Sequence, residues 1–208
     1  MTRVTPICSI MVATRFHERY VMGSMQNAHA LVVGIANYQQ IRPLPSIVLN
    51  DARDIHAVLA DPELGAYPFD TVQILLDAQA TRVALLTAFA QLAAQSNAES
   101  TVFIYLSGHG GRIESGPYAG EYVLPVDTAY TSDAALAQTA ISGSELTAAL
   151  RAIPARKLVV VFDCCHAGGL GEPKDASAPT LKAGLPERYY DALKAGRGRV
   201  ILASSRAD

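Results

Sequence analysis

Cysteine is scarce in this chain of 208 residues, which contains only Cys8, Cys164 and Cys165. An odd number of cysteines, two of them adjacent, makes a poor disulfide framework and lacks the spacing of a metal site. Charged residues are also few, at 17%, and the formal net charge of −2 includes no long run of either sign. The sequence therefore favours a free thiol in a reducing, cytoplasmic setting and gives no electrostatic basis for binding nucleic acid or a membrane surface.

Long apolar runs are missing as well. The early stretch Ile7 to Ala13 is too short to span a bilayer, and no convincing small-residue cleavage site follows it. We expect residues 1–27 to form a poorly ordered N-terminal extension. Half of the residues are apolar, a balance typical of one well-buried globular domain, which we place at residues 28–208.

Continuous apolar blocks predict strands that are buried on both faces of a sheet. Three segments with a helical apolar face lie between them, starting near Asn50 or Asp51, at Thr81, and at Ser142 with the capping-box partner Glu145. Strands that alternate with helices predict an α/β fold with a mainly parallel central sheet and helices on both faces. The predicted strands are Ala30–Ala36, Val72–Leu76, Thr101–Leu106, Leu158–Phe162 and Val200–Ala203.

In such sheets, functional residues gather in loops beyond the carboxyl ends of the strands. This rule selects residues 37–51, 107–111 and 163–169. Residues 168–198 are rich in glycine and proline, and we expect a long surface loop there with at most a short helix around 189–194.

Two of these strand ends carry chemistry. The third strand ends in Ser-Gly-His-Gly-Gly around His109, and the fourth in Asp-Cys-Cys-His-Ala-Gly around Cys165. A thiolate, an imidazole that handles the proton and backbone N–H groups for the oxyanion together perform acyl transfer. Either residue alone is more often structural than catalytic, so the hypothesis depends on their pairing at neighbouring strand ends.

These motifs resemble those of the caspase-fold cysteine peptidases, and among them the metacaspases and bacterial orthocaspases. Cys165 follows His109 by 56 positions, close to the family spacing. Further segments match in order from residue 28 to the end: Val32 to Tyr38, Leu49 to Ala52, and Tyr122 to Asp127. The resemblance implies a caspase-like three-layer sandwich and a cysteine endopeptidase that acts through a thioester acyl-enzyme on protein or peptide substrates.

The resemblance also assigns roles. It makes Cys165 the nucleophile and His109 its partner, with the backbone N–H groups of Gly110 and Cys165 as oxyanion hole. Cys164 has the opposite pleat parity and is expected to be structural, and His166 a turn residue.

The same family pattern places substrate-binding residues for the P1 side chain at Asp51, Ser107 and Asp163, with Asp208 as a weaker candidate. Carboxylates here attract a basic side chain, so the expected cleavage is after Arg or Lys. The alternatives are that Asp51 caps a helix and that Asp163 bonds to loop amides.

Several alternatives stay open. The chain stops after the fifth strand, where the fold usually continues into a small-subunit region, so an inactive scaffold module competes with the peptidase. The legumain, clostripain and separase branches would change the P1 preference. We expect no cofactor, since no dense acidic run supports calcium activation, and the resemblance favours a monomer. Self-cleavage is expected in the loop after Cys165, at Lys174, Lys182, Arg188, Lys194 or Arg197.

Overall fold

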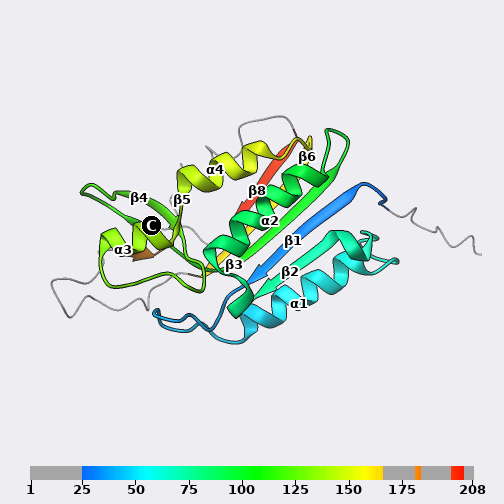
Figure 1. Ribbon diagram of the computed structural model, residues 1–208. Coiled ribbons are helices and arrows are strands. Elements are labelled where there is room, and N and C mark those ends of the chain that lie inside the picture. Colours follow the sequence, from blue (N-terminus) through cyan, green and yellow to red (C-terminus); the bar gives the residue numbers. More distant parts are fainter. Residues whose placement is uncertain (1–24, 166–180, 184–197, 204–208) are drawn as a thin grey trace, which may run out of the picture.

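The computed structural model describes residues 25–165, 181–183 and 198–203 (Figure 1). Its central sheet has the order β2-β1-β3-β6-β8, and all four pairings between these neighbours are parallel. The predicted mainly parallel sheet is confirmed, and so are its five strands. Their bounds are β1 Ala28–Gly34, β2 Val72–Leu76, β3 Thr101–Ile113, β6 Lys157–Cys165 and β8 Arg199–Ala203.

Helices cover both faces of this sheet, as predicted (Figure 1). Helix α1 (Ile47–Ala60) lies on one face, while α2 (Arg82–Gln95) and α4 (Gly143–Ala152) lie on the other. Alternate residues of β1 serve the two layers, because Ala30 and Val32 join the α1 core and Leu31 and Val33 join the α2 and α4 core. The remaining elements are η1 (Phe69–Thr71), η2 (Asp77–Gln79), β4 (Gly120–Val123), α3 (Asp133–Thr139), β5 (Ile141–Ser142) and β7 (Leu181–Ala183).

Two of the three predicted helix starts are confirmed. Thr81 caps α2 by accepting a hydrogen bond from the backbone N–H of Ala84, and Ser142 forms the predicted capping box with Glu145 at α4. The prediction of Asn50 or Asp51 as the cap of α1 is wrong, because this helix already begins at Ile47. Buried Val48 joins Leu49 on its apolar face, so the helix starts before the first apolar position of the sequence pattern.

Strand β3 is longer than its apolar pattern predicts. Its first part pairs with β6 as far as His109, and residues 110–113 then pair with β4 on one edge and, from residue 111, with β7 on the other. Residues 107–111 therefore lie within a strand and not in a loop. The extra pairing partners explain the difference, because they satisfy the backbone after the apolar residues end.

Strand β7 lies inside the segment predicted to be a surface loop. Its Lys182 is the register partner of Arg112 in β3, so this candidate cleavage residue lies in a paired strand and not in the predicted loop. The other four candidate cleavage residues, the predicted short helix at 189–194 and the N-terminal residues 1–24 lie outside the described residues. No helix in the described ranges has the length and apolar character needed to cross a membrane.

Candidate active site

The carboxyl ends of β3 and β6 bring the predicted site residues into register. Ser107 is the backbone partner of Asp163, and His109 is the backbone partner of Cys165. Two positions before Ser107 and Asp163, Tyr105 is the register partner of Val161, and both of these residues belong to the core beneath α1. The predicted catalytic pair thus occupies directly neighbouring positions of two adjacent strands.

The His109 imidazole is held in one orientation by the loop that follows β1. Its ring nitrogen Nε2 lies 2.9 Å from the carbonyl oxygen of Arg42, and its backbone N–H donates to the Tyr38 hydroxyl at 2.6 Å. Because a carbonyl only accepts, Nε2 carries the proton and the lone pair of the neutral ring is on Nδ1. Buried Nδ1 meets no hydrogen-bond partner among the described residues. It is therefore the atom that can take a proton.

Burial also sets the charge state of His109. The side chain is only 3% exposed, and apolar Leu85, Val123 and Leu124 line a small cavity beside it. This burial lowers the pKa of His109 below its ordinary value of 6.5, although the bond to the Arg42 carbonyl acts in the opposite direction. The ring is therefore neutral at pH 7 and ready to act as a base.

Close packing next to His109 requires a glycine. A Cβ atom added to Gly108 would lie 2.7 Å from the Tyr38 hydroxyl oxygen, which is the atom that accepts from the His109 backbone. The Tyr38 and His109 rings also contact each other, with their centroids 4.8 Å apart. Gly108 thus allows Tyr38 to approach the histidine.

Asp77 fixes the start of the same loop. Its Oδ1 accepts from the backbone N–H groups of Ala36 and Asn37 at 2.8 and 2.9 Å, and its Oδ2 accepts from the Asn37 side chain at 2.7 Å. Burial opposes ionisation of Asp77, but these hydrogen bonds outweigh it and lower the pKa of the carboxyl. Asp77 therefore positions the segment that carries Tyr38 and Arg42 to His109.

We expect Asp77→Asn to lower the melting temperature at pH 7, with a loss of about 1 to 2 kcal/mol, typical of a hydrogen bond to a charged group that is partly exposed. Because the folded pKa of Asp77 lies below 3.8, its stabilisation is complete above that pH and is lost as the pH falls through the folded value. The φ of 43° at Asp77 is tolerated by asparagine, so backbone strain is not introduced.

Thermal unfolding from pH 7 down to pH 3 checks this prediction. The difference in melting temperature between wild type and Asp77→Asn should become smaller toward pH 3. The Asp70→Asn variant, which removes one exposed carboxylate, is the control. A gap that stays constant over this range would contradict the role of the Asp77 charge.

The geometry around Gly110 bears on the predicted oxyanion hole. The His109 carbonyl accepts from the Leu124 backbone N–H at 3.0 Å, so His109 bonds toward the β4 side of the strand. Successive residues of an antiparallel ladder alternate between bonded and non-bonded pairs. The Gly110 N–H is accordingly directed to the opposite edge of β3, the edge on which β6 lies.

Two of the four predicted P1-binding residues, Ser107 and Asp163, are in direct contact, and a third, Asp51, acts on their neighbour Tyr105 through its charge. The Ser107 hydroxyl donates to the Asp163 carbonyl at 3.2 Å, and the Tyr105 hydroxyl donates to Asp163 Oδ2 at 3.0 Å. Burial raises the pKa of Tyr105, and the charges of Asp163 and of Asp51 on α1 raise it further. Asp51 is thus electrostatically coupled to the Tyr105 hydroxyl, and Asp208 lies outside the described residues.

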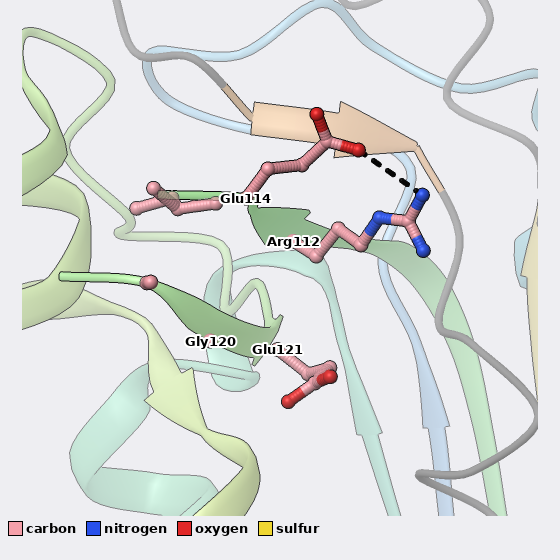
Figure 2. Close-up of a pocket in the computed structure, with 6 residues that line it drawn as sticks. Arg112, Glu114, Gly120 and Glu121 are labelled. Atoms are coloured by element: carbon pink, nitrogen blue, oxygen red, sulfur yellow. Dashed lines mark hydrogen bonds and ion pairs between the residues drawn. The ribbon is translucent and has the colours of Figure 1, made fainter. Parts of the chain in front are cut away.

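A separate hollow of about 490 Å³ lies on the β3–β4 hairpin. An ion pair of 3.2 Å joins Arg112 and Glu114 there, and the carboxylate of Glu121 points away from that pair (Figure 2). The lining, completed by Ile113, Ala119 and Gly120, includes none of the residues predicted for catalysis or P1 binding.

The arrangement suits acyl transfer. A neutral imidazole with an open Nδ1 lone pair occupies the strand position beside a cysteine, and a backbone N–H is aimed at the same edge. Within residues 25–165, 181–183 and 198–203, no group of three or more His, Cys, Asp or Glu side chains gathers as a metal site would require.

Comparison with known proteins decides the family. The family model described as the caspase domain of peptidase C14 matches residues 27–205. The chain belongs to the caspase-domain family. The members of this family are cysteine peptidases, which are hydrolases acting on protein substrates.

Other comparisons add little to this assignment. Among solved structures, the caspase domain is similar to the crystal structure of protein GSU0716 from Geobacter sulfurreducens, with 20% identity and a TM-score of 0.48. That match covers 68% of this chain and 51% of the other, so it spans about half of the solved protein. No curated protein matches the chain.

Sequence reasoning missed four residues of this caspase domain's site. Tyr38 was part of a matching motif but received no role, and the Arg42 carbonyl has no signal that a side-chain pattern can carry. Asp77 directly follows β2, so the strand-end rule would have found it had the second strand been included. Tyr105 looked like one more apolar residue of a buried strand.

Proposed function

We propose that this chain is a cysteine endopeptidase that cleaves after Lys or Arg. Cys165 is the nucleophile, His109 Nδ1 takes its proton, and the backbone N–H groups of Gly110 and Cys165 hold the oxyanion of the tetrahedral intermediate. Collapse of that intermediate releases the amine, which receives the proton from His109, and leaves a thioester. Water, activated by the same imidazole, then hydrolyses the thioester.

The observation that carries this proposal is the His109–Cys165 register pair. The His109 imidazole bonds to the Arg42 carbonyl through Nε2, and its Nδ1 has no hydrogen-bond partner among the described residues. The proposed P1 preference is supported by the Asp163 carboxylate beside Ser107 and by the charge of Asp51, which acts on the same Tyr105 hydroxyl that contacts Asp163. A basic side chain placed there would meet two carboxylates. The likeness to metacaspases within the family depends on the Asp-Cys-Cys-His-Ala-Gly motif.

Fluorogenic peptides with Arg, Lys, Asp or Asn at P1 test the proposal directly. We expect release from the Arg and Lys peptides and none from the other two. Release after Asp or Asn would retain the peptidase and reject the acidic P1 site. No release from any peptide by folded, reduced protein would favour the inactive scaffold.

The pH dependence of kcat/KM gives a further prediction. His109 must be neutral to accept a proton, and burial keeps its pKa below 6.5, so activity should fall only as the pH drops through that lowered value. The acid limb of the profile, which reports the free enzyme, is therefore expected to have its midpoint below pH 6.5. A midpoint above 6.5 would contradict the lowered pKa of His109.

A further inference from the structure

Tyr105 is a buried tyrosine whose hydroxyl reaches the proposed P1 site from the core side. The residue is 5% exposed and packs in the core beneath α1. Its hydroxyl donates to Asp163 Oδ2 at 3.0 Å. Because its pKa is raised by burial and by the two carboxylates, the hydroxyl stays protonated at any ordinary pH and donates permanently.

This bond limits how Asp163 can bind a substrate cation. A guanidinium group pairs best with a carboxylate through two parallel bonds, one to each oxygen. At Asp163, Oδ2 already accepts a hydrogen bond from the hydroxyl of a buried tyrosine. A paired approach by arginine must therefore compete with Tyr105.

An ammonium group has no such requirement. It is a compact charge with three rotatable donors, so it can bond to Oδ1 alone while its charge is still attracted by Asp51. The nearby Ser107 hydroxyl donates to the Asp163 carbonyl and so helps to hold this residue's backbone in place.

We propose that Tyr105 is a specificity-determining residue that makes the enzyme prefer lysine over arginine at P1. The inference rests on the proposed function, since it concerns the choice between the two basic side chains at that site. It assigns a role to a residue outside the motifs of the strand ends.

The test is the ratio of kcat/KM for two peptides that differ only in Lys or Arg at P1, measured for wild type and for Tyr105→Phe. The variant keeps the aromatic ring but removes the hydroxyl that bonds to Asp163 Oδ2. The ratio of kcat/KM for the Lys peptide to that for the Arg peptide should therefore fall by about tenfold, which corresponds to the loss of one hydrogen bond to a charged group. Tyr122→Phe is the matched control, because it removes a tyrosine hydroxyl that donates to the Tyr118 carbonyl at 2.7 Å.

The outcomes separate the inference from the proposed function. The inference is overturned if wild type cleaves both peptides but prefers Arg, or if Tyr105→Phe does not change the ratio. In either case the proposed peptidase function still holds. A wild type that cleaves neither peptide overturns both. Inhibition of wild type by peptide aldehydes ending in lysinal or argininal repeats the comparison without a variant, and stronger binding of the argininal would likewise overturn the preference.

Discussion

Cys165→Ala is expected to abolish peptide cleavage, while Cys164→Ala keeps a substantial fraction of it. Removing the nucleophile of a catalytic pair costs about four or more orders of magnitude in kcat. The register explains the contrast between the two cysteines, because Cys165 is the partner of His109 and Cys164 is the partner of Gly108. A glycine offers no side chain that could accept a proton.

Three measurements make this test decisive. The first is kcat/KM on a peptide that wild type cleaves, and the second is the melting temperature of each variant, which shows that loss of activity is not loss of folding. The third is labelling by iodoacetamide followed by mass spectrometry, where Cys165 should react first. Preferential labelling of Cys164, together with full turnover by Cys165→Ala, would show that the nucleophile was assigned wrongly.

The order of strands and helices could be predicted because its signals are local. The block at residues 158–162 is buried or half-buried throughout and contains no polar residue, and the block at Val72–Leu76 is apolar except for exposed Gln73. The capping box of Ser142 and Glu145 lies within four residues of sequence. Each of these features depends only on residues that are close together in the chain, so each can be predicted from a single sequence.

The extension of β3 and the insertion of β7 could not be predicted in this way. Residues 110–113 read as a glycine turn, and only the arrival of β4 and β7 on their two edges makes them a strand. The start of α1 was missed for a related reason. Val48 and Leu49 pack against Ala36, which is a tertiary contact and leaves no mark on the local pattern.

The residues of the candidate site also differ in whether local sequence could predict them. His109 and Cys165 were predicted because both stand at strand ends in glycine-containing motifs. The residues that hold His109 were not, because the Arg42 bond uses a backbone carbonyl and the Asp77 clamp joins positions about 40 residues apart in sequence. Sequence motifs thus point to the proposed reacting groups, and the structure shows which residues orient His109.

Loss of the Asp163 carboxylate should have the second largest effect. Asp163→Ala is expected to raise KM for Lys and Arg peptides sharply, because truncating one partner of a desolvated charge pair costs about 2 to 5 kcal/mol. The truncation also leaves the buried Tyr105 hydroxyl without the acceptor at 3.0 Å, so some loss of stability must accompany it. Asp163→Asn separates the two effects, since an amide oxygen can still accept from Tyr105 while the charge is gone.

Asp51→Ala should act in the same direction but less strongly, because this residue on α1 is part exposed and its pull on the cation is partly screened. It is not the helix cap, so its loss should leave the melting temperature nearly unchanged. Exposed Asp54→Ala, one turn further along α1, removes the same charge and should leave KM as it was. If Asp163→Asn and Asp51→Ala both kept the wild-type KM for basic peptides, the acidic site would have no part in P1 binding. A rise in KM with Asp163→Asn but not with Asp51→Ala would restrict the cation to Asp163, and Tyr105 would then decide its geometry alone.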